Sequence, residues 1–198
     1  DYYDFFYKKD KYFYAICGDA TGHGVISGIM VSVTKAGLHG IPMGDPPSIL
    51  GQLNRIVKRV NFGRLRMSLS VAKFDKNSVE LSSAAMPPTY FFSSKTKKLE
   101  EVLVPNLPLG GIETEKFDGF KVAFHPGDVM VMISDGLPEL PDSKNEILDY
   151  DKVYRCIKEN SEKSADEIKD ALVSLSDDWA DGIMNPDDIT IVVIKKVA

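Results

Sequence analysis

The chain has 198 residues, of which 43% are apolar and 27% charged, and its formal net charge is −5. This length suits one domain with a sizeable core, and the composition excludes a disordered chain. No apolar run approaches the roughly 20 residues of a membrane-spanning helix. The basic stretches at 8–11, 95–98 and 195–196 give nucleic-acid binding little support, because the first two are typical of solvated hairpin turns. We therefore expect no nucleic-acid partner and no direct membrane contact.

The chain contains two cysteines, Cys17 and Cys156, each within an apolar or amphipathic run. Both are predicted to be small core residues, so no disulfide framework is expected and a reducing, cytoplasmic location is favoured. Because the chain begins on a motif aspartate, Asp1, we expect a domain of a longer protein. A sensor domain or a membrane anchor of that protein would lie outside these residues.

The first third of the chain predicts a hairpin, a glycine-bounded loop and two helices. Aromatic and β-branched runs at 2–7 and 12–17, separated by Lys8 to Lys11, are typical of a β-hairpin. After the loop 18–24, a helix over 25–38 is expected to place on one face Ile26, Ile29, Met30, Val33 and Gly37. A second helix is expected over 47–60, with an apolar stripe of Ile49, Leu50, Leu53, Ile56, Val57 and Val60.

The remaining chain predicts mainly strands and a second pair of helices. Strands are expected at 67–74, 79–85, 89–93, 99–104, 120–124 and 129–134, separated by turn residues. Their close spacing favours antiparallel pairing. Helices are expected over 150–159 and 165–179, followed by a strand over 189–197. This order of elements predicts an α+β fold of two antiparallel sheets with helix pairs outside.

Aspartates lie at the ends of four predicted strands: Asp1 with Asp4, Asp19, Asp135, and Asp187 with Asp188. If these strands lie side by side, the carboxylates suit a hard divalent cation, because Mg²⁺ and Mn²⁺ prefer oxygen ligands. Neighbouring residues of an extended backbone point to opposite faces, so only one member of the last pair is expected to face a given site. We expect the same of the first pair.

The loop Gly18–Gly24 and the segment around Ser134 allow other interpretations. The glycines permit a tight bend around a ligand, but the alternative is a plain strand-to-helix connection. The loop lacks the Gly-Lys-Ser/Thr ending of a P-loop and the spacing of a dinucleotide fingerprint. Since no Gly-x-Ser-x-Gly surrounds Ser134, a nucleophile elbow is not expected.

Six motifs occur together in order: Asp-Tyr-Tyr-Asp (1–4), Gly-Asp-x-Thr-Gly-His-Gly (18–24), Pro-Leu-Gly (108–110), Pro-Gly-Asp (126–128), Ser-Asp-Gly-Leu (134–137) and Asp-Asp-Ile-Thr (187–190). This ordered set resembles SpoIIE-like phosphatase domains, the bacterial branch of the PPM (2C-type) metal-dependent serine/threonine protein phosphatases. The resemblance covers essentially the whole chain. It implies a single domain over 1–198 with an αββα sandwich, in agreement with the fold class predicted above.

The resemblance further implies a site for two Mn²⁺ or Mg²⁺ ions. Asp19 resembles the aspartate that bridges both ions, Ala20 the residue whose backbone carbonyl is a ligand, and Asp135 and Asp187 the remaining inner carboxylates. These three aspartates would be the catalytic residues. Asp1 resembles the N-terminal acidic position of the metal site. Crowded carboxylates repel one another until cations arrive, so weak binding is expected.

The implied mechanism is attack on phosphorus by a water or hydroxide that bridges the two ions, with no cysteine or serine nucleophile. Asp4, Asp188 and Thr190 are expected to brace the site, and His23 to shape its glycine-rich turn.

The implied function is dephosphorylation of phosphoserine or phosphothreonine in bacterial signalling, with an anti-sigma-factor antagonist (STAS) domain as a candidate substrate. Two alternatives stay open: a catalytically decayed binding module of the same fold, and a hydrolase of small phosphoesters. A dimer is compatible with the sequence.

The chain departs from the family pattern at three places. Where members commonly have Ala-Gly-His-Pro-Pro, this chain has Ala-Ala-Met-Pro-Pro at 84–88, so a histidine is replaced by Met86. Val-Ile-Ser-Gly at 25–28 replaces the frequent Val-Pro-Ala-Ala and suggests regulation by a partner or an attached domain. The segment 140–143 replaces an acidic and glycine-rich pattern.

Overall fold

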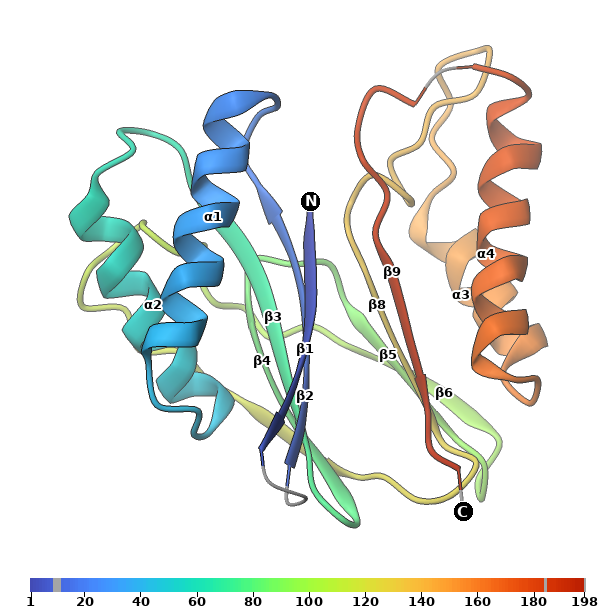
Figure 1. Ribbon diagram of the computed structural model, residues 1–198. Helices are drawn as coiled ribbons and strands as arrows, with labels where there is room; N and C mark the ends of the chain where they lie inside the picture. Colours follow the sequence, from blue (N-terminus) through green and yellow to red (C-terminus); the bar gives the residue numbers. More distant parts are fainter. Residues whose placement is uncertain (9–11, 184, 198) are drawn as a thin grey trace. The chain divides into compact units, whose positions relative to one another are not determined.

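The computed structural model describes residues 1–8, 12–183 and 185–197. Within these residues it contains nine strands and four helices (Figure 1). The chain divides into two compact units, one formed by Asp1–Met86 with Leu103–Ala123 and the other by Pro87–Val102 with Phe124–Ala198. Each unit contains one antiparallel sheet and two helices, which confirms the predicted α+β class.

The first unit contains a sheet in the order β1-β2-β3-β4-β7 and the helices α1 and α2. Its strands are β1 (Tyr2–Lys8), β2 (Tyr12–Ala20), β3 (Met67–Phe74), β4 (Ser78–Ala84) and β7 (Phe120–Ala123). Its helices are α1 (Val25–Gly40) and α2 (Pro46–Val60), which lie on one face of the sheet in Figure 1. The predicted hairpin of β1 and β2 is confirmed, although residues 9–11 of its turn lie outside the described residues.

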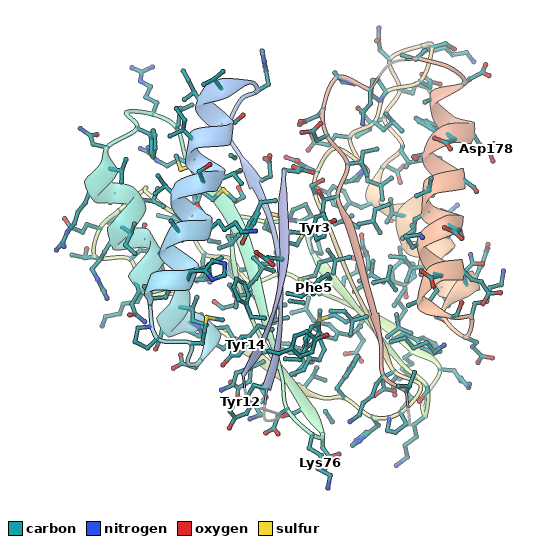
Figure 2. All side chains as sticks on the ribbon, viewed as in Figure 1. Tyr3, Phe5, Tyr12, Tyr14, Lys76 and Asp178 are labelled. Carbon is teal, nitrogen blue, oxygen red and sulfur yellow. The ribbon has the colours of Figure 1, made fainter. Side chains whose placement is uncertain are left out.

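The core of the first unit lies between this sheet and its helices. Alternation along β2 directs Tyr14, Ile16 and Ala20 toward the helices, where they join Leu50 and Leu53 of α2. The opposite face of β1 is aromatic and exposed at Tyr3, Phe5 and Tyr7; Tyr3 and Phe5 are labelled in Figure 2. The ring of Phe5 stacks on Phe13 at 5.6 Å, so the aromatic residues of this face support one another across the strands.

The predicted buried face of α1 is partly wrong. Met30 and Gly37 are buried as expected, together with Thr34 and Leu38, but Ile26 and Ile29 are 57% and 47% exposed. The helix is rotated because Thr34 is tolerated in the core, where its hydroxyl donates to the carbonyl of Met30 at 2.9 Å. The apolar stripe of α2 is largely confirmed, although Val60 is 47% exposed.

The second unit contains a sheet in the order β6-β5-β8-β9 and the helices α3 and α4. Its strands are β5 (Thr89–Ser93), β6 (Lys98–Val102), β8 (Val129–Ile133) and β9 (Ile191–Lys195), and its helices are α3 (Tyr150–Asn160) and α4 (Ala165–Ala180). The core joins buried β8 residues to one face of each helix, including Ile157, Ile168 and Leu172. The last strand begins two residues later than predicted, because Thr190 donates its backbone N–H to the Ser134 hydroxyl instead of a ladder carbonyl.

None of the helices in the described part of the chain has both the length and the apolarity needed to cross a bilayer.

Candidate metal centre

The end of β2 holds two of the predicted site residues opposite each other. Tyr2 pairs with Gly18 in the antiparallel ladder, so continuing this register by one residue places Asp1 opposite Asp19. Asp19 alternates with the helix-facing Ala20 and therefore lies on the sheet face away from α1 and α2. Directly opposed side chains have Cβ atoms about 4.5–5.5 Å apart, and like charges at that distance destabilise a sheet. A cation would offset this repulsion, so the pair is chemically suited to one.

Ala20 is the last residue of β2, and its carbonyl points to the β1 side of the strand. The neighbouring Thr21 N–H donates to Arg66 at 3.0 Å, which makes Thr21 and Arg66 the hydrogen-bonded pair with β3. Because ladder partners alternate, Ala20 directs its backbone groups the other way. Beyond it, Gly22 and Gly24 have φ values of 85° and 79°, which favour glycine, and so turn the chain into α1.

Asp4 braces α1 and does not extend the candidate site. Its carboxylate accepts hydrogen bonds from Tyr2 Oη at 2.9 Å and from the Phe5 N–H at 2.8 Å, and Lys35 Nζ lies 3.1 Å away. Burial opposes ionisation, but the hydrogen bonds and the Lys35 ammonium hold the pKa of Asp4 below its ordinary value. The carboxylate of Asp4 is therefore engaged with Tyr2, Phe5 and Lys35, and the role of Asp1 at a metal stays a prediction.

In the second unit, a buried serine joins the end of β8 to the segment before β9. Ser134 is fully buried; its N–H donates to the Thr190 carbonyl at 3.0 Å, and its hydroxyl accepts from the Thr190 N–H at 2.9 Å. The same hydroxyl lies 3.4 Å from the Asp188 carbonyl. Thr190 therefore braces the loop as predicted, and it does so through its backbone. Ser134 was missed as a positioning residue, although it directly precedes Asp135 at the end of an apolar run.

The two predicted aspartates of this unit lie on adjacent segments. Gly136 packs so closely on the Asp188 backbone that a side chain there would collide with its carbonyl, and a Cβ on Gly136 would lie 3.6 Å from the Asp187 Cβ. One oxygen of the Asp187 carboxylate accepts from the Asp188 N–H at 2.8 Å, which fixes its orientation. Asp135, one residue before Gly136, is half-buried, whereas Asp187 is exposed.

Register extended by one residue thus sets Asp1 opposite Asp19 in the first unit, and in the second unit Gly136, the residue after Asp135, packs on the Asp187–Asp188 segment. Among the described residues, no group of three or more His, Cys, Asp or Glu side chains is arranged to hold a metal ion. Two ions need more oxygen ligands than one pair supplies. The predicted site for two ions includes carboxylates of both units, and their grouping stays a prediction.

The other family motifs have structural roles. Gly110 of Pro-Leu-Gly donates its N–H to Asn54 Oδ1 at 2.8 Å, and Asn54 Nδ2 donates to the Ile112 carbonyl at 2.8 Å. The buried Asn54 side chain of α2 thus anchors this loop, a role that we did not predict from the sequence. Asp128 of Pro-Gly-Asp accepts from the backbone of Ser94 and His125.

Met86 is only 3% exposed, so the replacement of the family's histidine falls in the core. The residue before it, Ala85, has a φ of 58°, in the left-handed region that favours the family's glycine.

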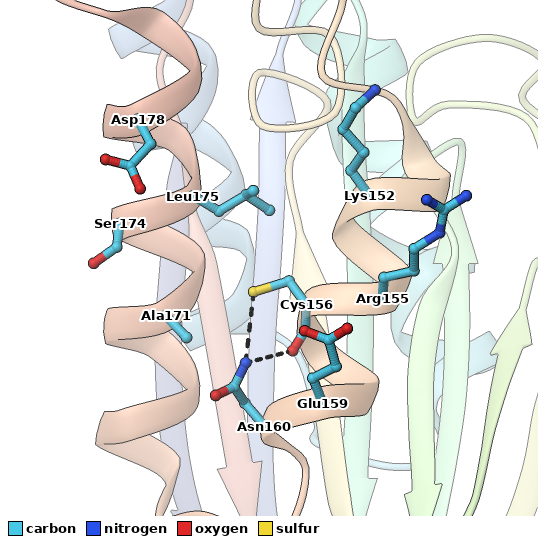
Figure 3. Close-up of a pocket in the computed structure, with 9 residues that line it drawn as sticks. All are labelled: Lys152, Arg155, Cys156, Glu159, Asn160, Ala171, Ser174, Leu175 and Asp178. Carbon is cyan, nitrogen blue, oxygen red and sulfur yellow. Dashed lines mark hydrogen bonds between the residues drawn. The ribbon is translucent and has the colours of Figure 1, made fainter.

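Neither cysteine has the character of an activated nucleophile. Burial, followed by the nearby Asp19 carboxylate, raises the pKa of the Cys17 thiol to about 12. Burial also raises the pKa of Cys156. Cys156 lines a groove of about 450 Å³ between α3 and α4, where Asn160 Nδ2 donates to its carbonyl at 2.8 Å (Figure 3). None of the motif aspartates lines this groove, so it is separate from the candidate metal centre.

Comparisons with known proteins find relatives that match almost the whole chain. Phosphoserine phosphatase RsbU of Bacillus subtilis (strain 168) is 26% identical over 204 residues, covering 99% of this chain and 59% of RsbU, so the chain spans less than two thirds of that relative. The SiaA-PP2C domain of Pseudomonas aeruginosa superposes with a TM-score of 0.87 over 98% of this chain and 80% of that one, at 17% identity. RsbX in complex with magnesium gives a TM-score of 0.72 over 96% of this chain and 85% of that one, at 18% identity.

The model of the Stage II sporulation protein E (SpoIIE) family matches residues 9–197, nearly the whole chain. This chain belongs to the SpoIIE family.

Proposed function

We propose that this chain is a metal-dependent phosphoserine/phosphothreonine protein phosphatase domain that acts in bacterial signalling, in the cytoplasm. The observation that carries the proposal is the retention of the expected aspartates at strand ends. It is supported by the β1–β2 register, which when continued by one residue sets Asp1 opposite Asp19, and by the packing of Gly136, next to Asp135, on the Asp187–Asp188 segment. Membership of the SpoIIE family and the name of RsbU as a phosphoserine phosphatase support the reaction.

In this proposal Asp1, Asp19, Asp135 and Asp187, with the Ala20 carbonyl, would hold two Mn²⁺ or Mg²⁺ ions. The donor set fits, because it consists of oxygens only, which hard divalent cations prefer. Bound ions of this kind supply positive charge to a phosphoryl group and lower the pKa of water. The magnesium in the structure of the related RsbX supports the choice of metal.

The remaining chemistry is positioning by the protein. Ser134 fixes the end of β8 against the segment before β9 and thereby holds the neighbouring Asp135 and Asp187 in place. Since the pKa values of Cys17 and Cys156 are both raised, a thiolate nucleophile is not part of the proposal. Met86 is buried, so this departure from the family pattern is a replacement of a core side chain and removes none of the aspartates.

The proposed substrate is a phosphorylated protein, with an anti-sigma-factor antagonist (STAS) domain as the first candidate. RsbU domains occur with RsbW in the same protein of Mycobacterium tuberculosis, which supports a place in sigma-factor control. Because the chain spans 59% of RsbU, the proposal includes an attached sensor domain that controls the activity.

The adjacent aspartates Asp187 and Asp188 offer a matched test of this function. Hydrolysis of a phosphoserine peptide would be measured with and without Mn²⁺ for the unchanged chain, for Asp187→Asn and for Asp188→Asn. We expect manganese-dependent hydrolysis that falls at least about 100-fold in Asp187→Asn and by less than about 10-fold in Asp188→Asn. Hydrolysis that persists in EDTA, or equal losses in both variants, would refute the assignment of Asp187 as a ligand.

A further inference from the structure

The basic residues of this acidic chain are unevenly distributed. Residues 46–74 carry six basic and no acidic side chains, whereas the rest of the chain carries 18 basic and 29 acidic ones. Four of the five arginines fall within twelve residues: Arg55, Arg59, Arg64 and Arg66. Arginine presents a planar fork of donors that matches carboxylate and phosphate oxygens in a bidentate manner. The C-terminal half of α2 and the following turn therefore carry the side chains that an anion-binding surface would need.

Four exposed basic residues of α2 and the following turn define what we call the arginine surface. They are three of the arginines and one lysine: Arg55, Lys58, Arg59 and Arg64. In the described part of the chain, none of the four has a carboxylate within 4.0 Å; Lys58 Nζ instead donates to the Gly111 carbonyl at 2.7 Å. The acidic residue Glu113 is close to α2 in its backbone: its carbonyl lies 3.5 Å from Asn54 Nδ2. Its carboxylate forms no ion pair with the arginine surface among the described residues.

The arrangement does not serve the stability of the helix alone. Lys58 and Arg59 in the last turn of α2 suit the negative end of the helix dipole. Arg55, however, lies three and four residues before them, and like charges at these spacings destabilise a helix. Arg64 lies outside the helix. A binding role accounts for the whole set, whereas helix capping accounts for two members.

A hydrogen-bonded turn connects this surface to the loop of the candidate metal centre. Asn61, at the end of α2, and Gly63 have left-handed φ values of 59° and 66°, and the Arg66 guanidinium donates to the Gly63 carbonyl at 2.8 Å. The Arg66 backbone N–H in turn donates to Thr21 Oγ1 at 3.3 Å, and its carbonyl accepts from the Thr21 N–H. Thr21 is two residues from Asp19, so the arginine surface is held at a fixed position beside the loop that carries this aspartate.

We propose that the arginine surface docks an acidic face of the phosphoprotein substrate beside the Asp19 loop. The inference rests on the proposed function and adds to it the charge of the partner. The arginine surface makes no contact with the phosphoryl group; its residues are positioning residues for the protein part of the substrate. Small substrates therefore gain nothing from it.

The test compares two phosphoserine peptides of equal length, one flanked by Asp and Glu and the other by Asn and Gln. The variants are Arg55→Gln/Arg59→Gln/Arg64→Gln and a control that removes equal charge elsewhere on exposed lysines, Lys95→Gln/Lys116→Gln/Lys144→Gln. The kcat/KM for each peptide and for p-nitrophenyl phosphate would be measured with Mn²⁺ at 20 and 200 mM salt. Fluorescence anisotropy would give the Kd of each labelled peptide for the metal-free protein.

We expect the unchanged chain and the lysine control to prefer the acidic peptide by roughly tenfold at low salt, as three exposed charge pairs would provide. The preference falls at 200 mM salt, because ions screen exposed charges. The arginine variant loses the preference, through KM more than kcat, and hydrolyses p-nitrophenyl phosphate normally.

Three results would overturn the inference: no preference in the unchanged chain, an undiminished preference in the arginine variant, or an equal loss in the lysine control. Duplex DNA and phosphatidylglycerol vesicles serve as competing anions, and tighter arginine-dependent binding to either would assign the arginine surface to that class instead. Absence of any p-nitrophenyl phosphate turnover would refute the proposed function. In that case, tighter binding of the acidic peptide by the unchanged chain than by the arginine variant, measured by anisotropy, would still support docking.

Discussion

Replacing Ala85 by glycine is expected to stabilise the protein, although glycine usually destabilises. Ala85 is exposed and has a φ of 58°, a left-handed conformation that costs an L-residue about 1–2 kcal/mol. Glycine removes this strain but increases the conformational freedom of the unfolded chain, at a cost of about 0.4–1 kcal/mol. The hydrogen bond from the residue 85 N–H to the Asn106 carbonyl, at 3.1 Å, is kept. The midpoints of these two ranges leave a net gain of about 0.8 kcal/mol.

Thermal unfolding followed by circular dichroism would measure this gain. For a chain of this size it corresponds to a rise in Tm of about 1–4 °C. Ala171→Gly is the matched control, because Ala171 lies within α4, where glycine costs about 1 kcal/mol relative to alanine. A lower Tm for Ala85→Gly, by as much as for Ala171→Gly, would show that the strain inferred from the backbone is absent.

Three further substitutions test single contacts of the structure, each by urea unfolding at constant m-value. Asn54→Ala leaves the buried Gly110 N–H without its acceptor and is expected to cost about 2–3 kcal/mol, and a cost below about 0.5 kcal/mol would deny it an anchoring role. Ser164→Ala removes the capping box at the start of α4 and is expected to cost about 1 kcal/mol; no measurable cost would contradict the cap. Lys35→Met is expected to cost less than about 1 kcal/mol at pH 7. The pKa of Asp4 is lower in the folded than in the unfolded chain, so the stabilisation by its ionised carboxylate is complete above the unfolded pKa of about 3.9. This stabilisation is lost as the pH falls through the folded pKa. The cost of Lys35→Met must therefore shrink at acid pH.

The sequence predicted the fold well where periodicity and turn chemistry agreed. β3 and β5 have the predicted bounds because glycine, proline or charged turns flank their apolar runs. The face of α1 was mispredicted, since Thr34 can satisfy its own hydroxyl within the helix and enter the core, which composition alone does not reveal. The start of β9 was mispredicted because a side-chain acceptor, Ser134, replaces a ladder bond there.

The sequence predicted those parts of the candidate site that lie at the ends of strands, but not the side chains that hold them in place. Alternation and the hairpin register, continued by one residue, set Asp1 opposite Asp19, and both can be read from the pattern of the hairpin. The contacts of Ser134 and Asn54 join segments that are more than 50 residues apart, and no local pattern signals such contacts. The four arginines between residues 55 and 66 are visible in the sequence, but they are separated by other residues. We considered only contiguous lysine-rich stretches, which lie mainly at hairpin turns, and so did not predict this surface.

Hydrolysis of p-nitrophenyl phosphate with and without Mn²⁺, by the unchanged chain and by Asp135→Asn, tests the central claim most directly. A parallel titration of Mn²⁺ followed by electron paramagnetic resonance reports metal binding independently of turnover. The account predicts manganese-dependent hydrolysis that is lost in Asp135→Asn, together with weakened Mn²⁺ binding. Turnover that survives both EDTA and the substitution, or Mn²⁺ binding that is unchanged by it, would contradict the claim that these aspartates hold a catalytic metal.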